Sequence, residues 1–489
     1  MFDLNLDLIL QQFVYQENSP LIFSSGLFLF LFLGFAFSYW MLLPHHRSRI
    51  VWTTLFSIYF YYKSSGSFFL LLVGSVIIDY HLAKWIDAAE SKIEKKRLLV
   101  LSLVANLGML AYFKYTNYLA DILSAATGVA IGPFDIFLPV GISFFTFQSL
   151  SYTIDVYRGQ LKALNNIWDY AFFVTFFPQM VAGPIVRAAD FLPQIPLVPT
   201  VSKEQLGRAV FLFCCGLFKK AVLSDYIGAN FVDRVFDSPL QYTGLENLFG
   251  IYGYTLQIYC DFSGYSDMAI AIGLLLGFSF PINFDAPYQS KSITEFWRRW
   301  HISLSTWLRD YLYVPLGGNR KGRTRTYINL MLTMLLGGLW HGAATRFIIW
   351  GGLHGAALAV ERFWKEIFPT APGGLRKTLG ALWTFHFVCF CWIFFRAQDL
   401  NTVQVMLSQI FFNFQPQVFS EFMAGYAPVI FWMGFGYFLH LLPKSLEITA
   451  QKAVTWLPLP LKALLIVLFI ALVMQMKSSE VQPFIYFQF

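Results

Sequence analysis

Residues 327–343 have the sequence YINLMLTMLLGGLWHGA, an apolar run that carries one histidine, His341, near its end. Arg325 lies in the polar loop before this run, and His341 follows it by 16 residues (341 minus 325). In a regular helix this spacing places the histidine roughly 24 Å into a hydrocarbon core about 30 Å thick. An ionisable group at that depth is costly and usually marks a function. Position alone leaves a second interpretation open, a neutral histidine that bonds a neighbouring helix.

The composition extends the apolar pattern to the whole chain. Of the 489 residues, 57% are hydrophobic and only 13% are charged, whereas soluble domains carry about 25% charged residues. The mean hydropathy is +0.55. We therefore predict an all-α polytopic membrane protein, with residues 1–489 forming a single integral-membrane domain in the lipid bilayer. The net charge of +7 requires no nucleic-acid partner, because Lys and Arg held in cytoplasmic loops produce a basic balance.

Apolar runs near the length needed to cross a bilayer recur along the chain. We expect helices at 21–43, 49–62, 67–82, 98–119, 136–152, 206–222, 246–278, 327–343, 347–363, 378–395, 425–442 and 459–476. The 246–278 stretch allows a span plus a re-entrant turn, and 168–182 is ambiguous by hydropathy alone. The total number of transmembrane or re-entrant helices is about 11 to 13 on this basis.

Charged loops give the expected orientation. Arg47 and Arg49 follow the first apolar run, and the next basic loop carries Lys84, Lys92, Lys95, Lys96 and Arg97. Cytoplasmic loops are enriched in Lys and Arg, so the N-terminus is expected outside. Lys444 and Lys452 before the last run favour an outside C-terminus as well. The first twenty residues contain no Lys or Arg, so we expect no cleavable signal peptide and a retained first helix.

Residues 281–326 interrupt the apolar pattern. This segment is too charged to span a bilayer, yet apolar residues recur in it at helical spacing: Phe296, Trp300, Leu304, Trp307, Leu308 and Tyr311. Ser292 and Glu295 form a capping-box pattern in front of them. We therefore expect an amphipathic helix at the membrane interface or inside the bundle. The basic residues of 320–325 that follow place this side of the protein in the cytoplasm.

Several reaction classes lack their motifs. The chain has no HExxH zinc site, no GxSxG elbow and no Walker loop, which disfavours metalloprotease, hydrolase and ATPase functions. Its five cysteines lie in or beside apolar segments and form no CxxC or other zinc spacing. We interpret them as packing residues and expect no bound metal and no bound cofactor.

Four motifs, in their order and spacing, resemble the bacterial branch of the membrane-bound O-acyltransferase (MBOAT) family. This branch includes the alginate O-acetylation membrane protein and the teichoic acid D-alanyl transferase. The motifs are FFPQMVAGPIVR (176–187), DFSGYSDMAIAIG (261–273), FDAPYQSKSITEFWRRWHISLSTWLRDYLYVPLGG (284–318) and GGLWHGA (337–343). The resemblance implies an MBOAT-like ring of helices around a central funnel or tunnel, in a bacterial cytoplasmic (inner) membrane. The length favours the polysaccharide O-acetylation subgroup.

The resemblance also implies the catalytic residues. The histidine of the GLWHG motif matches His341, and that of the WHISLS motif matches His301, so 281–342 is the expected catalytic motif region. An alcohol is a poor nucleophile at neutral pH, so its attack on a thioester requires a base, and histidine has a suitable pKa. We expect His341 to be that general base. His301 either orients it or bonds the developing oxyanion.

Other polar residues in apolar surroundings are candidates for the substrate path or for support of the site. For each of them, helix-to-helix hydrogen bonding is the competing interpretation. The candidates are Trp340, Trp300, Asp261, Ser263, Tyr265, Gln179, Arg187 and Ser305. The GxxxG spacings Gly338/Gly342 and Gly351/Gly355 indicate close helix packing.

The expected function is transfer of an acyl group from a cytoplasmic thioester to hydroxyls of a cell-surface or exported polysaccharide. Acetyl is the acyl group that we expect first. The donor is acetyl-CoA or an acyl-carrier protein, either of which the basic cytoplasmic face can attract. A periplasmic or extracellular SGNH-type transferase or esterase is the expected partner. D-alanyl or other acyl transfer to a teichoic-type polymer is one alternative. A non-enzymatic transporter or flippase is the other, although no inverted repeat is visible.

The C-terminal tail, residues 477–489, ends in the aromatic sequence PFIYFQF. A disordered terminus has no reason to carry such a run. Interfacial anchoring is one interpretation, because Tyr and Phe are frequent at membrane interfaces. The resemblance adds another, in which Tyr486 is an acyl relay that holds the acyl group as an ester between donor and acceptor. A phenol is more acidic than a sugar hydroxyl, which makes it the easier first nucleophile.

Overall fold

The computed structural model describes residues 6–17, 19–368, 373–476 and Phe484. The described part consists of helices joined by loops and contains no strand, which confirms the all-α prediction. The helices form two compact units, Met1–Ala209 with Met268–Pro281, and Val210–Asp267 with Ile282–Phe489. A single domain over 1–489 stays a prediction, because two compact units can belong to one functional domain.

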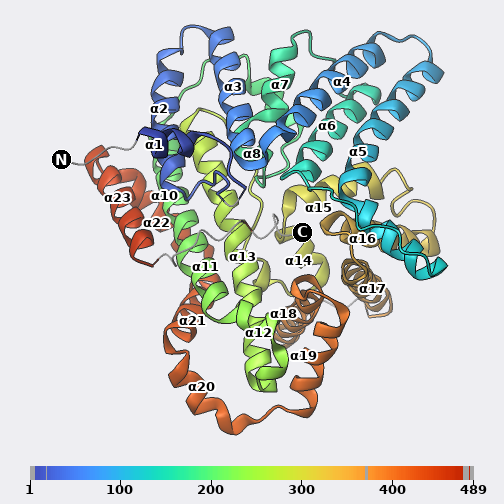
Figure 1. Ribbon diagram of the computed structural model, residues 1–489, viewed down its shortest axis with the longest axis vertical. Coiled ribbons are helices and arrows are strands. Elements are labelled where there is room, and N and C mark those ends of the chain that lie inside the picture. Colours follow the sequence, from blue (N-terminus) through green and yellow to red (C-terminus); the bar gives the residue numbers. More distant parts are fainter. Residues whose placement is uncertain (1–5, 18, 369–372, 477–483, 485–489) are drawn as a thin grey trace. The chain divides into compact units, whose positions relative to one another are not determined.

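The first unit is a bundle built mainly from the N-terminal helices (Figure 1). Helix α4 packs against α5, and α6 packs against both. The helices are α1 (Leu6–Phe13), α2 (Gly26–Met41), α3 (His46–Ser65), α4 (Phe69–Ala88), α5 (Lys92–Thr127), α6 (Ile142–Tyr157), α7 (Ile167–Thr175), α8 (Phe177–Met180) and α9 (Ala188–Phe191). The ambiguous stretch 168–182 is thus helical but broken at Phe176.

Aromatic rings fill the interior between α2, α3 and α8. Phe177 lies 5.1 Å from Phe56 and 5.6 Å from Phe35, measured between ring centroids, and all three side chains are buried. A buried carboxylate in the same unit, Asp79 of α4, accepts hydrogen bonds from Ser102 and Asn106 of α5. Such bonds satisfy polar groups that would otherwise be costly away from water.

The second unit contains the remaining helices. Two elements cross between the units, since α10 and α13 each have residues in both. The helices are α10 (Lys203–Leu217), α11 (Asp225–Ile227), α12 (Asp233–Asp237), α13 (Gly244–Leu275), α14 (Ile293–Arg299), α15 (Ile302–Leu308), α16 (Arg323–His341), α17 (Thr345–Ile367), α18 (Gly374–Arg396), α19 (Leu400–Phe412), α20 (Phe419–Gly425), α21 (Ala427–Leu441), α22 (Lys444–Trp456) and α23 (Leu459–Met476). Short π-helical turns, Phe218–Ser224 (η3) and Gly228–Val232 (η4), connect α10 to α12.

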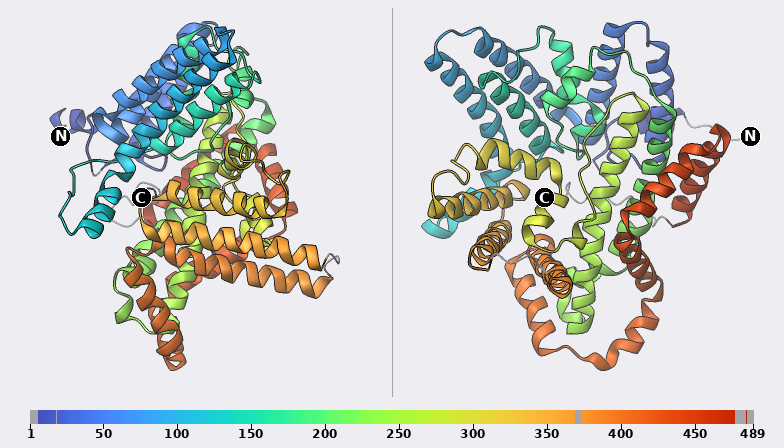
Figure 2. Two further views of the ribbon diagram at one scale, coloured as in Figure 1. Left: turned by 90° about the vertical axis from the view of Figure 1, so that its right-hand side faces the viewer. Right: turned by 180° about the vertical axis from the view of Figure 1, so that it is seen from behind.

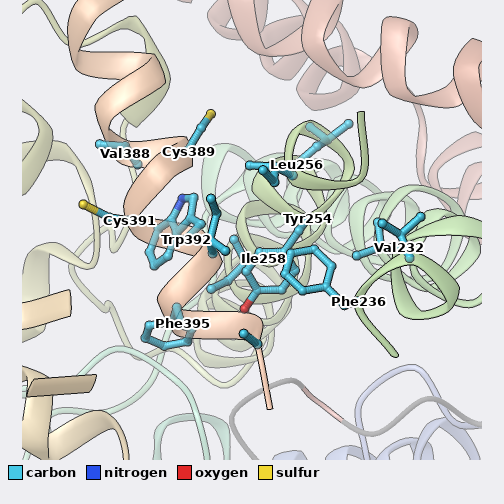
Figure 3. Packing of buried hydrophobic residues seen from close by; sticks show 14 of the residues in the cluster. Val232, Phe236, Tyr254, Leu256, Ile258, Val388, Cys389, Cys391, Trp392 and Phe395 are labelled. Atoms are coloured by element: carbon cyan, nitrogen blue, oxygen red, sulfur yellow. The ribbon is translucent and has the colours of Figure 1, made fainter. Parts of the chain in front are cut away.

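The core of the second unit is formed where α13 meets α18. Tyr254 and Ile258 of α13 are buried in one cluster with Trp392 and Phe395 of α18 (Figure 3). Cys389 and Cys391 lie in this cluster, and all five cysteines are free thiols. Cys260 of α13 lies in the same cluster, so the interpretation of the cysteines as packing residues is confirmed for these three.

Four helical stretches among the described residues are long and apolar enough to cross a membrane: His46–Ala88, Lys92–Thr127, Gly374–Arg396 and Leu459–Met476. A fifth candidate is the bent pair Pro416–Gly425 and Ala427–Leu441, with an angle of 94°. The other predicted stretches are also helical, but they are shorter or carry more polar residues. The ring around a funnel stays a prediction.

Two local expectations are wrong. The 246–278 stretch contains no re-entrant turn, because α13 continues unbroken over 32 residues. Its carboxylates Asp261 and Asp267 pair with Lys220 and Lys219 of the preceding helical segment, so these groups are satisfied without a bend in the chain. The amphipathic helix is also not continuous. It breaks between α14 and α15, where Trp300 is extended and His301 has φ of 41°, a left-handed backbone.

The predicted cap of the amphipathic segment is present. Ser292 accepts a hydrogen bond from the Glu295 backbone N–H, and the Glu295 carboxylate accepts one from the Lys291 backbone N–H. This satisfies donors that the first turn of α14 leaves open.

Helices α16 and α17 run side by side and touch through glycines (Figure 2). A Cβ atom at Gly338 would collide with the Phe347 carbonyl oxygen, and one at Gly351 with the Met334 carbonyl oxygen. At Gly355 a Cβ would lie 2.9 Å from the sulfur of Met331. The predicted role of these glycines in close packing is confirmed.

We predict that Gly338→Ala destabilises the protein, because its methyl group has no space beside a backbone carbonyl. Overpacking of this kind costs about 1–3 kcal/mol, so the midpoint of thermal unfolding in detergent falls. Gly352→Ala on α17 is the control, since its nearest neighbouring atom would be 3.6 Å away. Equal midpoints for the two variants would contradict the packing role of Gly338.

Candidate active site

His341 is the last residue of α16, and Gly342 ends the helix in an extended conformation. The imidazole is only 4% exposed. Three aromatic rings surround it, with centroid distances of 4.9 Å to Trp340, 5.1 Å to Trp350 and 5.2 Å to Phe395. The aromatic wall fixes the imidazole position through packing from α16, α17 and α18.

His301 occupies the break between α14 and α15 and is fully buried. Phe262 of α13 packs edge-on against its imidazole at 4.6 Å. Its Nδ1 lies 3.1 Å from the side-chain oxygen of Asn283. Burial lowers the pKa of His301 to about 3, because the charged form is disfavoured in low dielectric. His301 is therefore neutral at physiological pH.

Trp340 brings the two predicted histidines into one site. Its ring centroid is 4.9 Å from that of His341 and 6.3 Å from that of His301. The indole is 5% exposed. The sequence predicted both histidines and Trp340, and the structure brings them together in the second unit.

Trp300 belongs to the same buried cluster as Trp350 and Phe395, two of the rings around His341. It is 1% exposed and contacts Phe284 at 5.0 Å and Trp392 at 5.0 Å. Ser305 donates a hydrogen bond from its hydroxyl to the Trp300 carbonyl oxygen at 3.2 Å. Packing of Trp300 and the hydrogen bond from Ser305 stabilise the chain at the break between α14 and α15.

Asp261 forms a buried ion-pair cluster with two other residues. Lys220 donates hydrogen bonds to Asp261 at 2.6 Å and lies 2.8 Å from Asp225. Next to this cluster, Lys219 pairs with Asp267 at 2.7 Å. Both pairs tie the turn η3 to α13, which supports the helix-to-helix interpretation of Asp261. Ser263 and Tyr265 are buried on the same helix.

Gln179 and Arg187 belong to the first unit. Gln179 is buried, and its side-chain nitrogen donates a hydrogen bond at 2.6 Å to the backbone carbonyl oxygen of Phe173, near the end of α7. Arg187 is the residue before α9, and its carbonyl oxygen accepts from the Asp190 backbone N–H. A role of either residue in the substrate path stays a prediction.

The aromatic tail contributes one described residue to the second unit. Phe484 is 1% exposed, and its ring lies 5.6 Å from Phe262 and 5.1 Å from Tyr265. Phe262 is also the ring that packs on His301. Tyr486, the predicted acyl relay, lies outside the described residues.

Three residues near the site were missed in the sequence. Asn283, directly before the FDAPY motif, contacts His301. Lys220 stands in an apolar helical stretch and pairs with Asp261. His354 of α17 is buried 4.8 Å from Trp350 and accepts a hydrogen bond from the Trp297 indole at 3.3 Å. A polar residue in an apolar stretch was the available signal for Lys220 and His354, whereas Asn283 lies in the polar segment 281–326 and had no such signal.

The comparison with known families identifies the class of protein. The sequence matches "MBOAT, membrane-bound O-acyltransferase family" over residues 9–404. This chain therefore belongs to the membrane-bound O-acyltransferase family, and it is a multi-pass membrane protein and an O-acyltransferase. The match excludes the transporter or flippase alternative as the main function.

Individual relatives cover most or part of the chain. A probable alginate O-acetylase AlgI of Pseudomonas putida is 38% identical over 96% of this chain and 100% of its own length. A peptidoglycan O-acetyltransferase of Helicobacter pylori is 37% identical over 79% of each chain. A teichoic acid D-alanyltransferase of Bacillus subtilis is 30% identical over 54% of this chain and 69% of its own. All three are named as transferases or acetylases.

We predict that Lys220→Met lowers thermal stability strongly. The change leaves Asp225 and Asp261 beside each other without their shared cation. Breaking a buried ion pair by removing one partner costs about 3–5 kcal/mol, to be measured as a fall in the unfolding midpoint in detergent. The control is Lys162→Met, whose partner Asp87 lies 3.5 Å away and whose own side chain is 91% exposed. A midpoint for Lys220→Met equal to that of the control would refute the structural role of the cluster.

Proposed function

We propose that this O-acyltransferase moves an acetyl group from a cytoplasmic thioester to hydroxyls of an exported or cell-surface polysaccharide, with His341 as general base. The observation that carries the proposal is the meeting of His301 and His341 around Trp340 inside the second unit. A general base must be held within hydrogen-bond reach of the hydroxyl proton. Aromatic packing on three sides fixes the His341 imidazole for that purpose.

The reaction follows from ordinary acyl-transfer chemistry. The hydroxyl oxygen attacks the thioester carbonyl carbon, and its proton passes to the His341 imidazole. The carbon–sulfur bond then breaks, and the proton passes from the imidazolium to the leaving thiolate. A new oxygen ester and a free thiol result, without net consumption of protons. The first step needs the neutral imidazole, because only a nitrogen without a proton can accept one.

Acetyl is favoured over D-alanyl by the relatives. The two relatives named for O-acetylation cover 96% and 79% of this chain, at 38% and 37% identity. The relative named as a D-alanyltransferase covers 54% at 30% identity. A polysaccharide acceptor is supported because alginate and peptidoglycan, named for the first two, are both cell-envelope or exported glycans.

The proposed topology places donor and acceptor on opposite sides of the bacterial cytoplasmic membrane. The end of α4 and the start of α5 carry exposed Lys84, Lys92, Lys96 and Arg97, which the charge rule assigns to the cytoplasm. That face suits an anionic donor, either acetyl-CoA or an acyl-carrier protein. Both termini lie outside in this scheme, where an SGNH-type transferase or esterase is the proposed partner.

We predict that His341→Ala reduces acylation at least about 100-fold, because general-base catalysis contributes about 10²–10⁴-fold. His301→Ala is also strongly impaired. The measurement is incorporation of labelled acetate into extracted glycan in cells that express each variant, with labelled D-alanine supplied in parallel.

His386→Ala is the matched control, since His386 is an exposed histidine on α18 that hydrogen-bonds Tyr252. Its activity stays at the wild-type level. Wild-type acylation by His341→Ala, at equal amounts of folded protein, would remove the catalytic assignment. Incorporation of D-alanine instead of acetate would replace the acetyl proposal by the teichoic-type alternative.

The proposed route includes Tyr486 as an acyl relay. The support is Phe484, which is buried against Phe262 and Tyr265. Phe262 also packs on His301. In the first step the tyrosine oxygen replaces the thiolate on the acetyl carbon. In the second, the glycan hydroxyl oxygen replaces the tyrosine oxygen on the acetyl carbon, and the hydroxyl proton passes to the tyrosine oxygen as it leaves.

We predict that Tyr486→Phe stops acetylation of the glycan while the protein remains folded, because only the nucleophilic hydroxyl is lost. In wild-type protein incubated with labelled donor and no acceptor, mass spectrometry of the C-terminal peptide finds one added acetyl group. Tyr112→Phe, at an exposed tyrosine of α5, serves as the control with full activity. If the Tyr486→Phe variant is fully active, the relay is wrong and the tail serves only as a membrane anchor.

A further inference from the structure

Asn283 is placed to control the protonation pattern of His301. Its side chain is 1% exposed and lies in the loop between α13 and α14. The side-chain oxygen lies 3.1 Å from His301 Nδ1, 3.2 Å from the Ser303 backbone nitrogen and 2.9 Å from the Ser303 hydroxyl. The side-chain nitrogen donates to the Ser266 hydroxyl at 3.1 Å.

The orientation of this amide follows from its partners. A backbone N–H can only donate, so the Asn283 atom that faces the Ser303 nitrogen must be the carbonyl oxygen. The Asn283 backbone carbonyl also accepts from the Ile302 N–H at 2.9 Å. These two bonds satisfy the first donors of α15 and fix the asparagine relative to the helix.

The tautomer of His301 follows from the amide orientation. An amide oxygen carries no hydrogen, so the contact with Nδ1 requires the proton to be on Nδ1. Burial holds the pKa of His301 near 3 and keeps the imidazole neutral. In a neutral imidazole with Nδ1 protonated, Nε2 presents a lone pair and cannot donate.

The backbone of His301 supports a functional interpretation of this arrangement. Its φ of 41° and ψ of 56° lie in the left-handed region, which costs a residue with a side chain about 1–2 kcal/mol. Strained backbones concentrate at sites where a side chain must be aimed. Here the left-handed residue directs the imidazole toward Asn283 and Phe262.

We propose that Asn283 is a positioning residue that holds His301 with the proton on Nδ1, so that Nε2 presents a lone pair that accepts a hydrogen bond. This assignment rests on the proposed acyl transfer. It decides between orientation and oxyanion binding as the role of His301, because an Nε2 without a proton cannot donate a hydrogen bond to an oxyanion. As the hydroxyl oxygen bonds to the acyl carbon, its proton moves to His341, and His301 has the orienting role. When the bond from the acyl carbon to the leaving sulfur or oxygen breaks, the proton moves to that atom.

Nitrogen-15 solid-state NMR tests the tautomer without any need for activity. Protein labelled with ¹⁵N-histidine is reconstituted in lipid, and the His301 signals are assigned by their loss in His301→Gln. The proposal expects a protonated Nδ1 and an unprotonated Nε2 at neutral pH. A protonated Nε2 overturns it. Because this result does not depend on turnover, it separates failure of the tautomer from failure of the proposed acyltransferase function.

Asn283→Asp tests the positioning role by a pH profile. A carboxylate also accepts from Nδ1–H, but its charge stabilises the imidazolium and raises the pKa of His301. Because the neutral form is then populated only at higher pH, the acidic limb of acetyl transfer shifts upward by at least about one pH unit. Asn283→Leu, which lacks the acceptor, loses at least tenfold in kcat at every pH.

Asn247→Asp is the matched control. Asn247 is a fully buried asparagine of the same unit, and its side-chain nitrogen contacts the backbone carbonyls of Pro239, Tyr242 and Thr243. Its pH profile coincides with that of the wild type. If Asn283→Asp gives that same profile, the asparagine has a structural role only and the proposal is wrong. If Asn283→Asp does not fold, the NMR measurement on unmodified protein still decides the tautomer.

Discussion

The backbone contact between α16 and α17 is the constraint on which the position of His341 depends. At Gly338 and Gly351 a carbonyl oxygen of the facing helix occupies the space that a side chain would need. Close approach of this kind strengthens van der Waals packing in a membrane, where lipid removes the hydrophobic driving force between helices. It also brings Trp350 of α17 within 5.1 Å of His341 on α16. The glycines therefore set the site as well as the bundle.

Buried polar contacts connect the helical segments that do not pack through glycines. Lys220 and Lys219 connect η3 with α13 through carboxylates, and Asn283 connects the loop before α14 with α15. Each of these contacts joins segments that are distant in sequence and that apolar packing alone would leave free to slide. In a medium of low dielectric, an unmet donor or acceptor costs more than it does in water. Such contacts therefore specify one register between helices.

The sequence predicted much of this arrangement because the relevant signals are local. Apolar runs located the helices, GxxxG spacing located the contacts at Gly338 and Gly351, and the motifs located His301 and His341. The unbroken course of α13 was not predictable, because Asp261 finds its partner Lys220 only after folding. The break at His301 was missed for a related reason. Helical periodicity continues through Trp300 and Leu304, and the left-handed backbone depends on Asn283, a residue outside the repeat.

The two histidines illustrate how surroundings assign different tasks to one residue type. His341 is surrounded by the rings of Trp340, Trp350 and Phe395, which restrict its position mainly through packing. His301 has a polar partner on Nδ1, and that bond selects which nitrogen carries the proton. Orientation by a second group is what distinguishes a prepared base from a merely buried imidazole. On this ground His301 is an oriented hydrogen-bond acceptor before the substrate binds, whereas His341 is the base of the proposed transfer.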